Sequence, residues 1–301
     1  MAVTLTQLTA FLAVVRRGSV TAAAEELVVT QPSVSAAISA LERELGVQLT
    51  ERVGRTVTPT AAGRAYIDYA AEVLGLLERG RRAAQEAAAP ETQTLRVSAV
   101  TTAGEHMAPL LLQAFRARHP ELDVSLDVGN RDTVFARLVN HEVDVAITGR
   151  VPVGLRVHGE SFASNEIVLI TSASDPLARR RWVAPEELAR RPWLVREPGS
   201  GTRAMCEEYL ASQEIEPPLL TLGSNGAIRQ AARVGLGVAM ISKIAVKLEL
   251  DHGLIRLIRV RGGLPQRSWY VVRSDVGPVT EPVQQFLRFA HSAAARRALE
   301  D

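Results

Sequence analysis

One stretch, residues 30 to 46, constrains the fold of this chain most tightly, because the start, repeat and stop signals of a helix all fall within it. Thr30 is a good N-cap, and Pro32 falls in the first turn, where its missing N–H costs nothing. Apolar side chains then recur at spacings of four, three and four residues, at Val34, Ile38, Leu41 and Leu45. Such spacing lines one face of a helix. The sequence therefore predicts a helix that starts at Gln31 and runs to Gly46.

The opposite face of this helix is small and polar near its N-terminus. A surface of that kind can lie close against base edges in a DNA major groove. A shorter helix from Val20 to Leu27 would pack behind it through Ala23 and Leu27. By spacing alone, such a pair is more often an ordinary helical hairpin than a DNA reader. The candidate DNA contacts on the helix are Gln31, Pro32, Ser33, Ser35, Ala36 and Ser39.

Two flanking elements complete this N-terminal unit. A helix over residues 4–17 is expected before the pair. Residues 49–58 predict a short hairpin with Gly54 at its turn. Arg52 and Arg55 would meet DNA phosphates on either side, although alone the same residues fit a solvated basic turn equally well.

The residues from Ser19 to Arg52, with the TPTAAG that follows, resemble the winged helix-turn-helix signature of the LysR-type transcriptional regulators. The matching positions are Ser19, Ala22, Ala23, Leu27, Gln31, Pro32, Ser35, Ile38, Leu41, Glu42, Leu45, Gly46, Leu49, Arg52, Thr60 and Gly63. The resemblance implies a regulator that binds double-stranded promoter DNA and recruits RNA polymerase. Ala36 replaces an Arg of the family pattern, which removes a base or phosphate contact. Thr50 replaces a Phe, which is expected to loosen the wing, so base specificity does not carry over from the family.

Net charge does not by itself indicate DNA binding. The chain carries 35 Lys and Arg against 33 Asp and Glu, and residues 1–59 hold five of each sign. Phosphate attraction must therefore come from where the arginines lie.

The cellular setting is indicated by what the sequence lacks. A single cysteine, Cys206, rules out an internal disulfide framework and is expected to be a small buried hydrophobe. The N-terminus has no signal-like pattern and no apolar stretch approaches a membrane span. A cytoplasmic protein without a membrane partner is expected.

A long helix is predicted over residues 60–89, with an apolar seam at Tyr66, Ala70, Val73 and Leu77. Nothing nearby in sequence covers this seam, so we expect it to pair protomers of a homodimer or homotetramer. In the resembling family this element is the linker helix that joins protomers. The alternative is packing against the chain's own C-terminal domain. The polar residues 90–94 are the expected hinge.

Beyond the hinge, β-branched runs alternate with amphipathic helices, which predicts an α/β domain with a parallel sheet and covered faces. A second such unit is expected from residue 166 onward, and a late strand and helix close the chain. The resemblance implies a periplasmic-binding-protein-like effector domain of two lobes. The expected boundaries are 1–59 for the winged helix-turn-helix, 60–89 for the linker helix, 90–94 for the hinge and 95–301 for the effector domain. Within that domain we assign lobe I to about 95–162 and 268–301, and lobe II to about 163–267.

A ligand is expected at the carboxyl ends of the strands, where helix N-termini offer free N–H groups. Four strand ends carry hydroxyls, glycines or arginines, and GSGTR at the start of a helix is the best of them, although plain helix capping explains it equally well. With Arg131, Arg150 and Arg203 converging, we expect an anionic small molecule. The candidate effector contacts are Thr101, Thr102, Asn130, Arg131, Thr148, Gly149, Arg150, Ser200, Gly201, Thr202, Arg203 and Asn225.

Enzyme motifs fail on inspection. HEVDV at His141 lacks the second histidine of a zinc helix, and GLGVAM at Gly235 lacks the third glycine of a dinucleotide fingerprint. No catalytic residue, metal or cofactor is predicted. The stretches VTTA, VGNR, AITGRVP and REPGSGTR resemble the regulators of carbon-fixation operons, which respond to phosphorylated metabolites. Two alternatives stay open: an aromatic or amino-acid effector, or a solute-binding-like module whose N-terminal helices mediate protein contacts.

Overall fold

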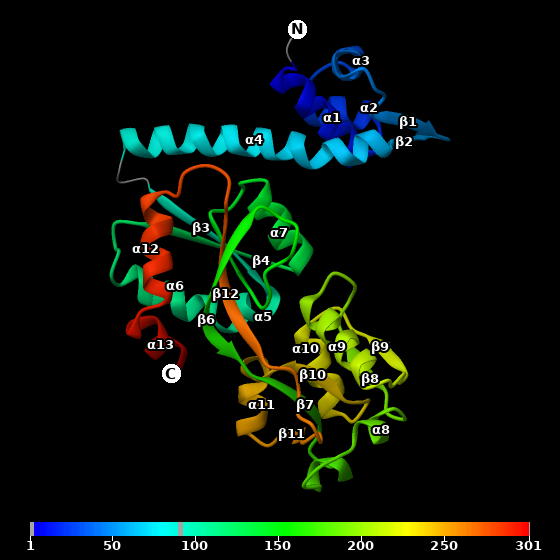
Figure 1. Ribbon diagram of the computed structural model, residues 1–301, viewed down its shortest axis with the longest axis vertical. Coiled ribbons are helices and arrows are strands. Elements are labelled where there is room, and N and C mark those ends of the chain that lie inside the picture. The colour runs from blue at the N-terminus through cyan, green and yellow to red at the C-terminus, as the bar shows by residue number, and fades with distance from the viewer. Residues whose placement is uncertain (1–2, 90–92, 301) are drawn as a thin grey trace. The chain divides into compact units, whose positions relative to one another are not determined.

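The computed structural model describes residues 3–89 and 93–300 and divides the chain into two compact units. The N-terminal unit extends to Ala88 and also includes Asn140–Glu142, and the larger C-terminal unit holds the rest of the chain from Ala89. The predicted hinge over residues 90–94 has its first three residues outside the described residues. Figure 1 shows the helices and strands of each unit.

The N-terminal unit is a three-helix group followed by a hairpin and a long helix. Its elements are α1 (Leu5–Arg17), α2 (Val20–Leu27), α3 (Gln31–Leu45), β1 (Thr50–Val53), β2 (Thr56–Pro59) and α4 (Ala61–Ala88). The predicted start of α3 is confirmed, because the Thr30 hydroxyl accepts a hydrogen bond from the Ser33 N–H. Gly46 ends the helix with a φ of 69°, in the left-handed region that glycine adopts without strain.

The core of this unit lies between α1, α2 and α3. Val34, Ile38 and Leu41 are buried in it, as the spacing of α3 predicts. The start of α4 packs closely on the residue before the hairpin: a Cβ built on Gly63 would lie 2.0 Å from the carbonyl oxygen of Leu49. No larger residue fits at that position without moving the backbone.

Helix α4 spans 28 residues. The predicted apolar seam lies along it and is only partly covered by the rest of the described chain. Ala70 is buried, but Val73 and Leu77 remain 50% and 53% exposed. Exposed apolar side chains in register along a long helix are typical of a surface that pairs with another helix.

Lobe I of the C-terminal unit is built on a five-stranded sheet of order β4-β3-β5-β12-β6. The strands are β3 (Thr94–Val100), β4 (Asp123–Gly129), β5 (Val145–Thr148), β6 (Val157–Asn165) and β12 (Arg267–Ser274). Strands β3, β4 and β5 are parallel, as expected, whereas β12 is antiparallel to both β5 and β6. The accompanying helices are α5 (Thr101–His106), α6 (Ala108–Arg116), α7 (Arg131–Val139), α12 (Glu281–Ala290) and α13 (Ala293–Glu300). The expected closing helix is therefore two helices, since the Ser292 hydroxyl accepts from the Ala295 N–H and starts the second.

Lobe II has a three-stranded sheet of order β10-β7-β11 and a parallel pair, β8 and β9. Its strands are β7 (Ile167–Ser172), β8 (Trp193–Val195), β9 (Leu219–Thr221), β10 (Ala239–Ser242) and β11 (Ile255–Ile258). Its helices and turns are η2 (Pro176–Arg179), α8 (Pro185–Leu188), α9 (Gly201–Ser212), α10 (Asn225–Arg233), η3 (Lys243–Val246) and α11 (Lys247–Asp251). The expectation of a second parallel unit holds for β8 and β9, and for a parallel bridge between Trp193 on β8 and Val238 just before β10. Strand β7, by which the chain enters this lobe, is antiparallel to both of its neighbours, β10 and β11.

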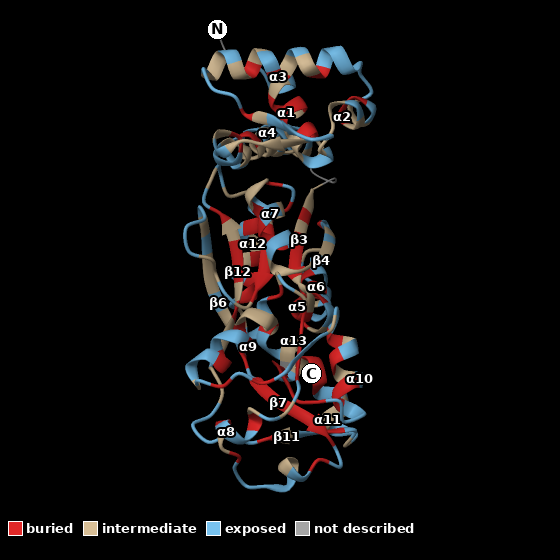
Figure 2. Ribbon diagram, turned by 90° about the vertical axis from the view of Figure 1, so that its right-hand side faces the viewer, coloured by how far each residue is buried: buried red, intermediate tan, exposed pale blue. Residues whose placement is uncertain are grey.

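The two lobes have separate cores, visible as the buried residues along β3, β12 and β7 in Figure 2. Phe115 and Phe286 meet edge to face in lobe I, with ring centroids 5.2 Å apart, and Trp193 packs near Tyr209 in lobe II. The chain passes from lobe I to lobe II between β6 and β7 and returns between β11 and β12. This arrangement brings loops of both lobes to the same edge of the lobe I sheet.

Candidate functional sites

The N-terminal half of α3 presents most of the predicted DNA contacts to solvent. Gln31, Pro32, Ser33, Ala36 and Ser39 are exposed, and Ser35 is half-buried. The Ser33 hydroxyl lies 2.8 Å from that of Thr30, so it is held close to the helix start. Within the described ranges, the side chains of Gln31 and Ser39 make no hydrogen bond, which leaves their polar groups available to a partner.

Thr50, where the family pattern has Phe, is anchored by polar contacts. One carboxylate oxygen of Glu42 on α3 accepts from the Leu49 N–H at 2.9 Å, the Thr50 N–H at 3.0 Å and the Thr50 hydroxyl at 3.1 Å. The hairpin is therefore tied to α3 at its first residue. The loosening expected from the loss of an aromatic side chain is offset by these three bonds.

The hairpin carries both predicted phosphate contacts on its surface. Arg52 lies on β1 opposite Val57, and Arg55 follows Gly54 in the turn. Both arginines are exposed, and neither has an ion-pair partner within residues 3–89 or 93–300. Arg16 and Arg17, in contrast, both bond to Glu26. Arg43 and Arg64 also lack an ion pair among the described residues, but each donates to a backbone carbonyl, so the cations with neither kind of partner lie on the hairpin.

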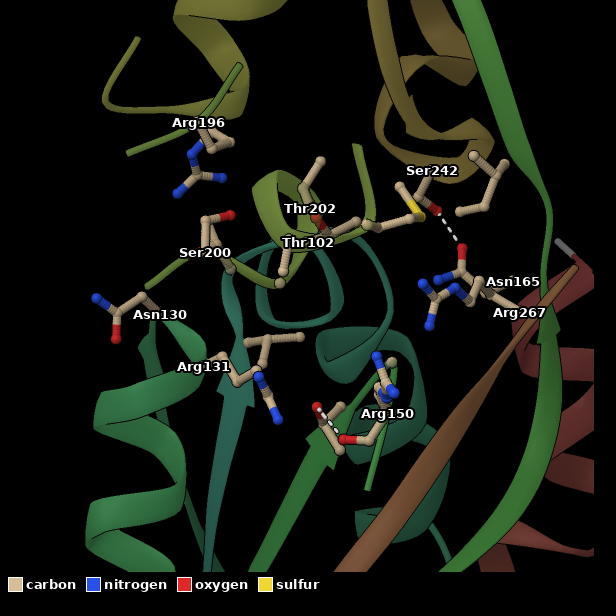
Figure 3. Close-up of a pocket in the computed structure, with 18 of the residues that line it drawn as sticks. Thr102, Asn130, Arg131, Arg150, Asn165, Arg196, Ser200, Thr202, Ser242 and Arg267 are labelled. Carbon is tan, nitrogen blue, oxygen red and sulfur yellow. Dashed lines mark hydrogen bonds between the residues drawn. The ribbon is translucent and has the colours of Figure 1, made fainter. Parts of the chain in front are cut away.

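The second site is a cavity between the two lobes, at the carboxyl ends of β3, β4 and β5 (Figure 3). The empty space there, counted together with the open solvent at its mouth, is about 760 Å³. The predicted effector contacts that line it are Thr101, Thr102, Asn130, Arg131, Thr148, Gly149, Arg150, Ser200, Gly201 and Thr202. The elements brought together are the starts of α5, α7 and α9 and the end of β5.

The lining is strongly cationic, with four arginines and one carboxylate. The arginines are Arg131, Arg150, Arg196 and Arg267. Glu208 on α9 accepts from Arg150 Nη1 and, at 2.8 Å, from Arg267 Nη2, so it bridges two guanidinium groups of lobe I from lobe II. Burial alone would raise the pKa of Glu208, but the hydrogen bonds from Arg150 and Arg267 lower it overall. The carboxylate therefore stays ionised at neutral pH.

Arg196 is held by a buried network rather than left free. Its guanidinium bonds to both carboxylate oxygens of Glu197, at 2.7 and 2.8 Å, and donates at 2.7 Å to the Asn225 carbonyl oxygen. The Asn225 amide in turn donates at 3.0 Å to the Thr102 hydroxyl in lobe I. Asn225 does not line the cavity, but it positions two residues that do.

The start of α9 and Arg131 make the part of the cavity best prepared for an anion. Ser200 is the N-cap of α9, yet its buried side chain makes no capping bond, so among the described residues no side chain caps the first N–H groups of the helix. A Cβ built on Gly201 would lie 3.9 Å from Arg131 Cδ, which places that arginine against the helix start. Arg131 Nε is buried and has no hydrogen-bond partner among the described residues.

Arg203 does not converge with the other arginines as expected. It donates to Glu207, to the carbonyl of Arg196 and to Thr221, and it does not line the cavity. Arg203 lies two residues after Gly201 on the helix. Its side chain is therefore rotated about 200° around the helix axis from the direction of Gly201, which faces the cavity. Sequence reasoning missed other lining residues, of which the polar ones are Asn165, Arg196, Glu208, Ser242 and Arg267. Several come from crossing strands or from the middle of a helix, whereas the sequence prediction considered only residues at the carboxyl ends of parallel strands.

Two other kinds of feature are absent from the described residues. No group of three or more His, Cys, Asp or Glu side chains is arranged to hold a metal ion. No described helix is long and apolar enough to cross a membrane.

A winged helix-turn-helix unit and a two-lobed ligand cleft together define a ligand-responsive DNA-binding regulator. Two family models match the chain: a bacterial regulatory helix-turn-helix protein of the lysR family over residues 5–64, and the LysR substrate binding domain over residues 88–295. The chain therefore belongs to the LysR family of DNA-binding transcriptional regulators, with an effector-binding domain.

Curated relatives are similar over almost the whole chain. The HTH-type transcriptional activator CmpR of Synechocystis sp. is 34% identical over 97% of this chain and 96% of its own length. The HTH-type transcriptional regulator CbbR of Sinorhizobium medicae is 35% identical, covering 98% and 94%. The RuBisCO operon transcriptional regulator of Allochromatium vinosum is 34% identical, covering 98% of each. The expected resemblance to regulators of carbon-fixation operons is confirmed.

Solved structures match the fold of both units. The regulatory domain of Synechocystis CcmR in complex with 2-PG is 28% identical over 66% of this chain and 96% of that one, with a TM-score of 0.63. Full-length CbnR complexed with its target DNA covers 98% and 99% at 23% identity, with a TM-score of 0.64.

Proposed function

We propose that this regulator senses a small phosphorylated anion in the cleft between lobes I and II. The observation that carries the proposal is Arg131, whose buried Nε has no partner among the described residues and which lies against the free N-terminus of α9. A phosphate there would receive N–H, hydroxyl and guanidinium donors together. The 2-PG complex of the CcmR regulatory domain supports the same ligand chemistry.

The effector would act by favouring the closed arrangement of the lobes. Residues of both lobes line the cavity, so an anion between them stabilises that arrangement over an open one. With α4 pairing two chains through its exposed seam, closure would change how protomers pack and how their α3 helices are spaced on two DNA half-sites. RNA polymerase recruitment would follow the altered spacing. The role is regulatory binding in the cytoplasm, without catalysis.

Fluorescence anisotropy tests both sites in one experiment. The full chain is titrated with its own upstream DNA and with a scrambled duplex over a salt series, with and without 2-phosphoglycolate. We expect preference for the native duplex, log affinity falling linearly with log salt, and a change in affinity only when the phosphorylated ligand is present. Equal, weak binding to both duplexes would contradict DNA reading at that operator. A response to benzoate or an amino acid, and none to 2-phosphoglycolate, would replace the proposed effector class.

A further inference from the structure

Helix α9 lies along the cavity with one face toward it. The residues of this helix that line the cavity include Gly201, Ala204, Met205 and Glu208, at positions i, i+3, i+4 and i+7. This spacing keeps side chains on one helix face. The seven residue steps from Gly201 to Glu208 advance about 10 Å along the helix axis. The cavity therefore has one end at the start of α9 and another at Glu208.

The lobe I sheet supplies cations at the same two ends. Arg131 follows β4 and Arg150 follows β5, and β3 lies between those two strands. Two strand spacings separate them by about 10 Å. Arg267 opens β12, which pairs with β5, so Arg267 and Arg150 belong to the same end. Figure 3 shows Arg131 apart from Arg267, with Arg150 on the side of Arg267.

The two ends differ in what their cations already hold. At the first end, the Arg131 Nε and the Ser200 hydroxyl have no bond within the described residues. At the second end, the carboxylate of Glu208 already accepts from both Arg150 and Arg267. That carboxylate occupies the position which an anionic ligand group would take.

We propose that Glu208 is an internal counter-ion, and that a second anionic group of the effector displaces it from Arg150 and Arg267. The inference rests on the proposed function, because it needs an anion to bind first beside Arg131. It adds that the effector is extended and anionic at both ends. Ala204 and Met205 flank the middle of the ligand with small and apolar contacts. Glu208 therefore lowers the affinity for doubly anionic effectors, since each must compete with it for the same two guanidinium groups.

Calorimetric titration of the full chain tests this competition with a matched pair of probes. The probes are 1,5-pentanediol bisphosphate and pentyl phosphate, which differ only in the second phosphate. The wild type should bind the bisphosphate more tightly. In Glu208→Gln we expect the bisphosphate to bind about fivefold more tightly still, as the loss of a partly exposed bridge allows. Pentyl phosphate should tighten far less, because its only phosphate lies about 10 Å from the lost charge and the Coulomb energy falls with distance.

Glu207→Gln is the control. It removes the same charge at the neighbouring residue, whose carboxylate pairs with Arg203 outside the cavity. It should change neither affinity, and thermal unfolding should show both variants folded. Equal tightening of both probes in Glu208→Gln, or an unchanged or weaker bisphosphate affinity, would overturn the counter-ion role and leave the anion cleft intact. If neither probe binds wild type or Glu208→Gln, the proposed function fails together with the inference.

Discussion

The DNA-reading surface and the effector cleft use their arginines in different ways. On the N-terminal unit, Arg52 and Arg55 are exposed and lie apart from the uncharged helix face of α3 that is proposed to read bases. In the cleft, four arginines face one small volume, and Arg196 and Arg267 are each held by a carboxylate. Exposed charges are screened by salt, whereas part-buried charges keep more of their strength. The comparison predicts salt-sensitive DNA affinity and a less salt-sensitive response to the effector.

The largest effect should come from Gly63→Ala, which is expected to destabilise the N-terminal unit and to leave the C-terminal unit unchanged. In Gly63→Ala the new Cβ meets the Leu49 carbonyl oxygen, so we expect the N-terminal unit to lose about 3 kcal/mol of stability and the protein to lose DNA affinity. Effector binding should survive. Gly80→Ala is the control on the same helix, because nothing lies within 4 Å of its built Cβ. Thermal unfolding and anisotropy measure both, and a Gly63→Ala protein as stable as wild type would contradict the close approach.

Removing the unpartnered arginine should affect only the cleft. Arg131→Ala removes charged hydrogen bonds to the ligand, and we expect effector affinity to fall by about 2 kcal/mol, or about 30-fold. DNA affinity without effector should not change. Arg203→Ala removes an equal charge outside the cavity and should leave effector affinity near that of wild type. Equal losses in both variants, measured by calorimetry, would mean that net charge rather than position governs binding.

Within the DNA-reading surface, mutations on α3 should change sequence specificity, whereas mutations on the hairpin should change the affinity for any duplex. Gln31→Ala should weaken binding to the native operator by about 1 kcal/mol and leave a scrambled duplex unaffected, as expected for a base contact. Arg52→Ala should weaken both duplexes alike and reduce the salt slope by about 1, as expected for a phosphate contact. Anisotropy over a salt series distinguishes them. The reverse pattern would exchange the two roles.

The smallest effect is expected at Cys206, on the core face of the same helix whose other face carries Glu208. Burial raises the pKa of the Cys206 thiol to about 12, so almost no thiolate exists at neutral pH. The native protein should resist iodoacetamide, and guanidinium-unfolded protein should react at the rate of a free cysteine. Rapid labelling of the native state, read by mass spectrometry, would show that this face of α9 opens to solvent.

The helices of the N-terminal unit could be predicted from sequence because their signals are local. Thr30, Pro32 and Gly46 mark the ends of α3, and its apolar spacing gives the buried face within a single window of residues. What the sequence did not show is the set of bonds from Glu42 to Thr50, since these join residues eight apart through a turn.

The cleft could be predicted only in part, for a physical reason that differs from residue to residue. Thr102 and Arg131 each lie two residues after the end of a parallel strand, so the rule for parallel sheets places them at the ligand edge. Arg267 opens an antiparallel strand and enters the same edge from the other direction. Glu208 lies two turns into α9, where only the orientation of the whole helix decides what it faces. Asn225 lies outside the cavity because its amide is used in joining Arg196 to Thr102.

Strand β12 has a consequence for the order in which the chain matures on the ribosome. Residues 267–274 sit between β5 and β6, so the lobe I sheet lacks a central strand until nearly the whole chain has been synthesised. The N-terminal unit takes only Asn140–Glu142 from later in the chain, well before β12, so it can fold before that strand is made. A stalled or truncated product would thus carry a finished DNA-reading surface and an incomplete sensor. Such a fragment would bind DNA without a response to the proposed effector, so effector control of DNA binding depends on the synthesis of the last strand.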